Sequence, residues 1–152
     1  MKVFNFLVVE PDLEWAFIDG SYIKAHQHSA GAAGPVNQAV GASRAGKTSK
    51  IHMGVDAFGL PIKFEITGGQ IHDSTAADSR GSVPIIPRKR NSKTGNDDID
   101  WNLYGHRHLV ENMFARLKHY RALATRYDKL KRNFQSMACA LLWLAMWNAN
   151  RP

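Results

Sequence analysis

The residues with the clearest chemical potential are a tyrosine, two cations and a glutamate that recur along one predicted helix. At about 100° per residue, the side chains of Tyr104, Arg107, Glu111 and Lys118 fall within about 60° of one another. A glutamate that has a tyrosine and two cations beside it on one helix face can belong to a functional site. Arg107 and Glu111 are equally a favourable i,i+4 ion pair on a solvated helix face. The spacing alone leaves both interpretations open.

A second carboxylate gives this helix face a possible partner. Asp19 follows the apolar run Trp15-Ala16-Phe17-Ile18 and precedes Gly20. The pattern predicts a buried strand that delivers Asp19 at its C-terminal end. Carboxylate oxygens are the ligands that Mg²⁺ prefers, so Asp19 and Glu111 together are candidate metal ligands if the fold brings the strand and the helix together.

Three other patterns are weaker candidates. His26 and His28 alternate in a Gly/Ala-rich segment, which provides no fixed geometry for a metal ion. The pair His72-Asp73 is not accompanied by a serine or cysteine nucleophile motif. Residues 41–48 match the spacing of a phosphate-binding P-loop, but that loop follows a hydrophobic strand and opens a helix, and neither is expected here.

The charge of the chain indicates a polyanionic partner. Twenty Lys and Arg against thirteen Asp and Glu give a net charge of +7. Residues 88–132 hold twelve basic and five acidic residues, which equals that whole excess. A basic stretch of this kind is typical of nucleic-acid binding, although it can also be a solubilising surface. The single cysteine, Cys139, excludes a disulfide scaffold.

The elements that must position these residues follow from length and hydrophobic pattern. With 152 residues and 44% hydrophobic content, the chain is long enough for one domain with a real core. The apolar run Met137–Trp147 is too short to span a bilayer. After the strand that ends at Asp19, the pattern predicts a flexible loop over 25–50, a β-hairpin over 51–57 and 60–67, a short strand over 83–87 and a basic turn over 88–93.

From Asp100 the hydrophobic period becomes helical and stays so, with at most one break, to Asn148. Asp97, Asp98 or Asp100 can cap the start of this helix. The run Met137–Trp147 is predicted to pack in the core, with Cys139 as a small buried hydrophobe. A core stripe is predicted on the first helical part, formed by Leu103, Val110, Phe114 and Leu117.

These residues lead to a family resemblance. The spacing of Tyr104, Arg107, Glu111 and Lys118 matches the signature of insertion-sequence transposases with a DDE active site, and the surrounding stretch resembles the IS5 type in particular. Three further blocks resemble that type and occur in its order: FIDGSYIKAHQHSAGA, SKIHMGVDAFGLPIKFEITGGQIHDS and VPIIPRKRN. The resemblance implies an α/β fold with an RNase H-like core, of which residues 14–150 are a catalytic-domain fragment. It also implies a cytoplasmic, nucleoid-associated bacterial protein.

The resemblance implies a role for each matched residue. Asp19 corresponds to the first catalytic aspartate and Glu111 to the third carboxylate, and both would bind Mg²⁺ or Mn²⁺. Tyr104, Arg107 and Lys118 take the supporting positions of the signature. The substrates would be the terminal inverted repeats of the element and target DNA. The DNA-binding residues of the basic turn would be Arg88, Lys89, Arg90 and Lys93.

The sequence departs from the family where the second catalytic aspartate is expected. Ten residues separate Asp73 from Pro84, whereas even a minimal strand–helix–strand unit takes about 30. We expect an internal deletion, an incomplete central sheet with an unpaired strand edge, and no room before Asp19 for an N-terminal DNA-binding domain. Neither Asp73 nor Asp78 is expected to substitute, and Asp56 is expected to be structural. The chain is therefore an impaired transposase or, alternatively, a non-catalytic DNA-binding remnant that pairs with or inhibits an intact transposase.

Overall fold

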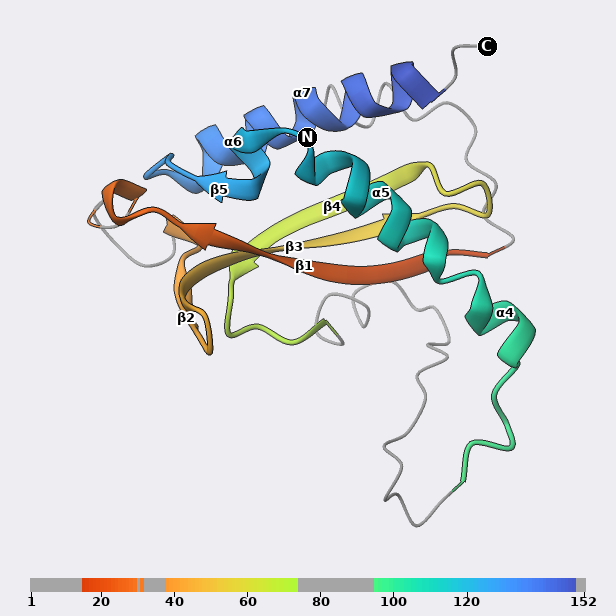
Figure 1. Cartoon of the computed structure of the whole chain (residues 1–152). Coiled ribbons are helices and arrows are strands. Elements are labelled where there is room, and N and C mark those ends of the chain that lie inside the picture. Colours follow the sequence, from red (N-terminus) through yellow and green to blue (C-terminus); the bar gives the residue numbers. More distant parts are fainter. Residues whose placement is uncertain (1–14, 30, 32–37, 74–94, 150–152) are drawn as a thin grey trace.

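An antiparallel sheet forms the centre of the molecule. The computed structural model describes residues 15–29, 31, 38–73 and 95–149. Its three long strands are β1 (Phe17–Ala25), β3 (Gly46–Val55) and β4 (Pro61–Gly68), with β3 between the other two. Figure 1 shows the sheet strongly curved, with the helices α5, α6 and α7 on one of its faces. The fold is therefore mixed α/β, as the sequence predicts.

The predicted β-hairpin is confirmed, and it is longer than expected. β3 and β4 pair in register from Ser49↔Gly68 to Gly54↔Lys63. Asp56 closes the turn because its Oδ1 accepts hydrogen bonds from the backbone N–H groups of Phe58 and Leu60 at 3.0 and 2.8 Å. Gly59 supplies the positive φ of 80° that the turn requires. Asp56 is thus structural, as expected.

The flexible loop predicted over 25–50 is wrong for its second half. Residues 41–43 form β2 (Gly41–Ser43), which pairs with the start of β3 through a tight turn at Arg44 and Ala45. Gly46, with φ of 89°, allows that turn. Gly, Ala and Ser show no alternation of apolar and polar side chains, so the sequence does not reveal this strand. The backbone hydrogen bonds of the strand do not depend on that alternation. The P-loop spacing over 41–48 therefore lies in a β-hairpin with no helix after it.

The first strand is also longer than predicted. Asp19 is the third residue of β1, not its C-terminal residue, because the strand continues through Ser21–Ala25. Its register with β3 runs from Phe17↔Val55 to Lys24↔Thr48. The expectation that the strand ends at Asp19 is therefore wrong, since Gly20 is tolerated inside the sheet. Asp19 lies near the start of the strand, opposite Met53.

The C-terminal third is broken more often than the sequence predicts. Its helices are α4 (Trp101–Gly105), α5 (His108–Lys118), α6 (Arg121–Ala124) and α7 (Lys131–Ala149), and β5 (Thr125–Arg126) lies between the last two. Asp100 caps α4 by accepting a hydrogen bond from Leu103 N at 3.0 Å. Arg126 anchors β5 through hydrogen bonds to Ser49 Oγ at 2.6 Å and Asp128 O at 2.9 Å. Burial lowers the pKa of Arg126, although the Asp128 charge opposes this.

The core lies between the sheet and the helices. Met53, Val55, Phe64 and Ile66 of the sheet are fully buried. The helices contribute Val110, Met113, Phe114, Leu117, Leu123, Phe134, Ala138 and Leu142. The predicted stripe is confirmed for Val110, Phe114 and Leu117, whereas Leu103 is half-buried.

The C-terminal run is helical but only partly in the core. Cys139 is half-buried and packs against the core. Trp143 and Trp147, which were predicted to be core residues, are 38% and 53% exposed. Their rings contact each other with centroids 5.7 Å apart. One face of α7 packs on the sheet, and these two rings lie outside that contact.

One edge of β1 is largely open. β3 covers one edge through eight register pairs, and β5 pairs in parallel with the other edge at Lys24 and Ala25. Over the described residues, the segment Phe17–Ile23 has no strand on that side. The predicted strand over 83–87 lies outside the described residues, so the incomplete central sheet stays a prediction.

Several predicted features lie outside the described residues. They are Asp78, the short strand over 83–87, and the basic-turn residues Arg88, Lys89, Arg90 and Lys93. Within the described residues, none of the helices is both long and apolar enough to cross a membrane.

Candidate active site

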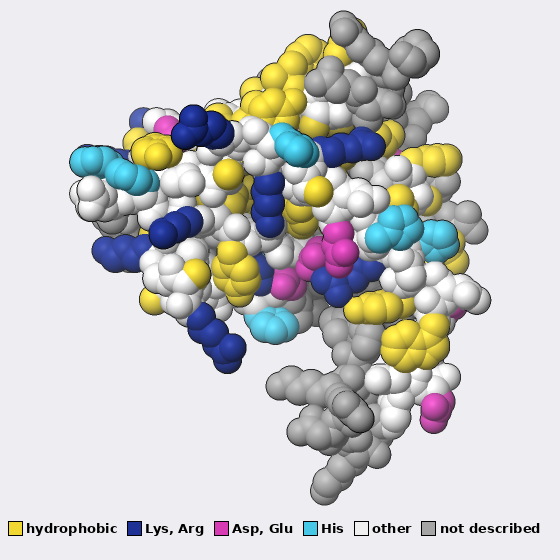
Figure 2. Space-filling model, in the orientation of Figure 1, with side chains coloured by type: hydrophobic (Ala, Val, Ile, Leu, Met, Phe, Trp, Pro, Cys, Tyr) yellow, Lys and Arg dark blue, Asp and Glu magenta, His cyan; other side chains and the backbone are white. Residues whose placement is uncertain are grey.

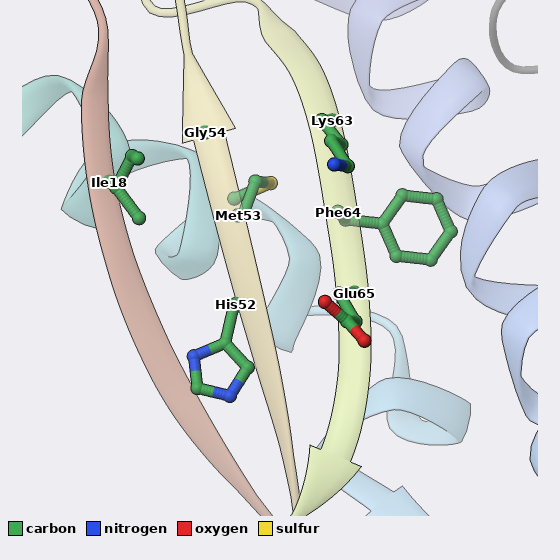
Figure 3. A pocket seen from close by; sticks show the side chains of 7 residues that line it. All are labelled: Ile18, His52, Met53, Gly54, Lys63, Phe64 and Glu65. Atoms are coloured by element: carbon green, nitrogen blue, oxygen red, sulfur yellow. The ribbon is translucent and has the colours of Figure 1, made fainter. Parts of the chain in front are cut away.

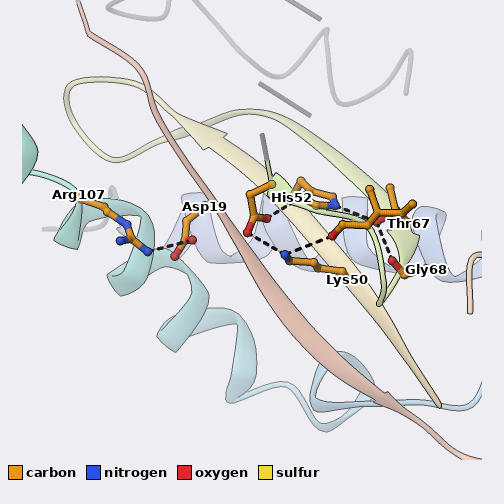
Figure 4. A network of polar contacts seen from close by, with 8 residues as sticks. Asp19, Lys50, His52, Thr67, Gly68 and Arg107 are labelled. Carbon is orange, nitrogen blue, oxygen red and sulfur yellow. Dashed lines mark hydrogen bonds and ion pairs between the residues drawn. The ribbon is translucent and has the colours of Figure 1, made fainter. Parts of the chain in front are cut away.

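Asp19 and its neighbour Gly20 face opposite sides of the sheet, and each side carries a polar cluster. Side chains alternate along a strand, so Asp19 shares the helix-covered face with its partner Met53. Gly20 pairs with His52 and faces the other side. Figure 4 shows Asp19 with Arg107 on one side of β1, and Lys50, His52 and Thr67 on the other. We call them the ionic cluster (Asp19, Arg107 and Glu111) and the buried network (Lys50, His52, Thr67 and Asp73).

The ionic cluster brings the strand carboxylate and the helix carboxylate together. Arg107 Nη2 lies 3.1 Å from Asp19 Oδ1 and 3.8 Å from Glu111 Oε1. Arg107 stands at the junction of α4 and α5, and Glu111 is in the first turn of α5, where a negative charge favours the helix dipole. One guanidinium therefore joins two carboxylates that lie 92 residues apart in the chain.

Tyr104 completes this arrangement. Arg107 Nη1 donates a hydrogen bond to Tyr104 Oη at 3.0 Å. This bond and the one to Asp19 raise the pKa of Arg107, and burial opposes them only in part. The guanidinium is therefore permanently charged and fixed from two sides. Of the four predicted signature residues, Tyr104, Arg107 and Glu111 are brought together, whereas Lys118 at the end of α5 is exposed and makes none of these contacts.

The ionic cluster is accessible to ligands. The side chains of Asp19, Arg107 and Glu111 are 20%, 39% and 59% exposed. Exposed carboxylates can exchange an arginine partner for a metal ion or water at low cost, since surface ion pairs contribute little. In the described part of the chain, no three His, Cys, Asp or Glu side chains gather closely enough to hold a metal ion. The described site thus offers two carboxylates.

The buried network on the opposite face has inaccessible cations and a carboxylate whose side chain is 36% exposed. Asp73 accepts hydrogen bonds from Lys50 Nζ at 2.7 Å and from His52 Nδ1 at 2.8 Å. His52 Nε2 lies 2.8 Å from Thr67 Oγ1. Lys50 is 3% exposed and His52 2%, so removal of Asp73 would leave a buried cation without its partner.

Asp73 is held in its charged form by this network. Burial alone would raise its pKa, but the hydrogen bonds from His52 and Lys50 outweigh burial and bring the pKa to about 2. An aspartate that is neutralised on one face of β1 cannot serve Asp19 on the other. The structure therefore agrees with the expectation that Asp73 does not replace the missing aspartate. Its imidazole partner is His52 rather than the adjacent His72 considered from sequence.

Asp73, His52 and Thr67 stand in the order of a carboxylate–imidazole–hydroxyl triad, yet the surroundings do not suit catalysis. Thr67 Oγ1 donates to the carbonyl of Gly68 at 3.2 Å. Beside His52 is a small hollow lined by Ile18, His52, Met53, Gly54, Lys63, Phe64 and Glu65 (Figure 3), with room for about one water molecule. A substrate does not fit into this hollow, and the Thr67 hydroxyl donates to a backbone carbonyl, so we interpret the network as structural.

Gly20 makes the network possible. A Cβ atom at this position would overlap the Asp73 carboxylate and the end of the Lys50 side chain. The backbone of β1 thus lies directly against the buried network, one residue from Asp19. Sequence reasoning missed this role, although Lys50 and His52 at alternate positions in an otherwise apolar strand are a recognisable signal of a buried polar face.

One comparison with known proteins identifies a relative of this chain. The chain is 30% identical over 132 residues to a protein of Brucella ovis named "Putative transposase for insertion sequence element IS6501". The match includes 64% of this chain and 98% of that protein. No family model matches the sequence, and no solved structure matches it. At this identity and coverage, the chain belongs to the family of insertion-sequence transposases.

Proposed function

We propose that this chain is a transposase polypeptide of the IS5 type with the remains of a DDE active site in an RNase H-like core. The observation that carries the proposal is the ionic cluster, in which Arg107 joins Asp19 of β1 to Glu111 of α5. The antiparallel order of β1, β3 and β4, with β5 parallel to β1, supports that core. The family membership supports DNA as the partner.

The donor set suits one divalent cation better than two. Asp19 and Glu111 are oxygen donors on different elements, and both are solvent-accessible. Mg²⁺ is often held by one or two carboxylates while it keeps several waters. A bound Mg²⁺ or Mn²⁺ would supply charge stabilisation at phosphorus and a more acidic water. A two-metal arrangement needs at least one further carboxylate, and the described residues offer none nearby.

The chain's own residues would act as follows. Asp19 and Glu111 hold the cation at the start of β1. Arg107, which Tyr104 orients through its 3.0 Å hydrogen bond, turns from the carboxylates to a phosphate oxygen of the DNA. A guanidinium suits this role because it is always charged and binds phosphate through two donors.

We propose further that catalysis by this chain is impaired. The alignment with the relative is 132 residues long, but it includes only 64% of this 152-residue chain. Some of its positions are therefore residues that the relative has and this chain lacks. Among the described strands, none pairs with Phe17–Ile23 on the β5 side of β1, where an additional strand would fit. The second candidate function, a DNA-binding remnant that pairs with an intact transposase, is favoured by the same two observations.

Plasmid nicking distinguishes the two candidates. The purified chain is incubated with supercoiled plasmid and Mg²⁺ or Mn²⁺, beside Asp19→Ala and the matched control Glu65→Gln, whose exposed carboxylate is on the opposite face. Metal-dependent nicking that Asp19→Ala abolishes and Glu65→Gln retains would support the residual active site. If folded, DNA-bound protein produces no nicking above background, the chain is the non-catalytic remnant.

DNA affinity itself should depend steeply on salt. The net charge of +7 predicts that neutralised phosphates release counterions, so the logarithm of the binding constant falls with the logarithm of salt concentration. Fluorescence anisotropy with a labelled duplex at several salt concentrations measures the slope. A flat dependence would contradict an electrostatic footprint.

A further inference from the structure

The histidine pair at the end of β1 is part of an exposed stack of three rings. The ring of His26 lies between those of His28 and Tyr127, with centroids 4.9 and 4.6 Å apart and ring planes within about 27° of parallel. The two imidazoles are stacked face to face. We call the three residues the ring stack.

The ring stack is built on fixed backbone. His26 N donates to Arg126 O at 2.8 Å, which joins the end of β1 to β5. The 3-10 turn η1 (Gln27–Ser29) is closed by Ser29, whose N and Oγ both donate to His26 O at 2.8 and 2.7 Å. Ser29 is fully buried, and so is Arg126, the residue before Tyr127. The backbone that carries the three rings is therefore held in place on both segments.

The ring stack is open to solvent and lies in a basic region. Tyr127 is 58% exposed and His28 is exposed. Figure 2 shows histidines at this end of the molecule, with Lys and Arg side chains on the surface around them. Apart from the buried Arg126, the neighbouring segments 24–29 and 126–132 contain a single acid, Asp128, against four cations, namely Lys24, Lys129, Lys131 and Arg132.

We propose that the ring stack is a binding site for unpaired nucleotides of single-stranded DNA. An unpaired base can stack on an exposed aromatic face while nearby cations follow its phosphates, whereas the faces of bases within a duplex are already stacked. The inference rests on the proposed function, in which DNA is the partner. It goes further by naming the place where the single strand binds. His26 follows the last residue of β1 and is seven residues after Asp19, which is about 23 Å in an extended strand.

Fluorescence anisotropy of the full chain tests the proposal. The probes are a short fluorescein-labelled oligothymidine, an abasic strand of the same length, and a duplex. We expect the chain to prefer oligothymidine to the abasic strand. Tyr127→Ala should weaken oligothymidine binding about tenfold and leave duplex binding unchanged. Tyr127→Phe should retain wild-type affinity because it keeps the ring.

Matched variants separate stacking from loss of structure. Phe58→Ala removes a ring that is 73% exposed, in the β3–β4 turn at the opposite end of β1, and should change nothing. His28→Ala provides an independent test of the stack should Tyr127→Ala fail to fold. Equal losses for single strand and duplex, or equal affinity for the abasic strand, would overturn the ring-stack site alone. A wild-type chain that binds no DNA probe would overturn the proposed function together with it.

Discussion

The two faces of β1 at Asp19 and Gly20 carry polar clusters of opposite character. The ionic cluster on the helix side is open, with side chains 20–59% exposed and one arginine shared between two carboxylates. In the buried network on the other side, Lys50 and His52 are nearly inaccessible, whereas the side chain of Asp73 is 36% exposed. Both clusters contain carboxylates paired with cations, so residue types alone do not distinguish them. The exposure of the cations does, because a solvent-exposed arginine can exchange its partner and a buried lysine or histidine cannot without large cost.

The largest expected effect is that of filling the space at Gly20. Gly20→Ala places a methyl group against the Asp73 carboxylate, which must then leave Lys50 and His52. We expect a loss of about 3 kcal/mol in the free energy of unfolding. Urea denaturation measures it. In an Asp73→Ala background the same substitution should cost much less. Equal costs in both backgrounds would show that the added methyl group does not act through the Asp73 carboxylate.

Removal of the Asp73 charge should have a slightly smaller effect, with a defined pH dependence. The pKa of Asp73 falls from 3.8 to about 2 on folding, so its ion pairs stabilise the fold above about pH 4. That contribution is lost as the pH decreases through 2. Asp73→Asn should therefore be less stable than wild type at neutral pH, and the two should converge in acid. A difference in unfolding free energy that is constant from pH 6 to pH 2 would contradict the network.

The smallest expected effect on stability comes from the open cluster. Arg107→Ala removes an ion pair that is more than one-third exposed, so we expect a change of about 1 kcal/mol or less in unfolding free energy. The same variant should weaken DNA binding, which anisotropy measures at fixed salt. Lys63→Ala, which removes an exposed cation of β4 outside the cluster, is the control. If Arg107→Ala changes stability strongly and DNA affinity not at all, the cluster is merely a salt bridge.

The sequence was sufficient for the parts that depend on local pattern. The β-hairpin, the Asp100 cap and the spacing that brings Tyr104, Arg107 and Glu111 onto one helix face all follow from residues close in the chain. Asp19 was identified as the partner of Glu111 through its family motif. Their contact depends on tertiary packing that no local rule supplies.

The failures have equally physical causes. β2 consists of Gly, Ala and Ser, which show no hydrophobic alternation, so the sequence predicts a loop there and not a strand. The helix breaks near His106 and His119 have no proline to mark them. The buried network was missed because Lys50 and His52 come from one strand and Asp73 from beyond the next. Only the folded sheet places them against Gly20.

The pairing of β1 with β5 also has a consequence for the order of folding. The residues that pair among β1, β3 and β4 are much closer in sequence than Lys24 and Thr125, which pair although about a hundred residues separate them. Because the entropy of closing a loop rises with its length, contacts between distant segments slow folding. The three-strand meander should therefore be the early part of the fold. The last step would be the docking of β5, which Arg126 secures and which closes the end of the sheet where the ring stack assembles.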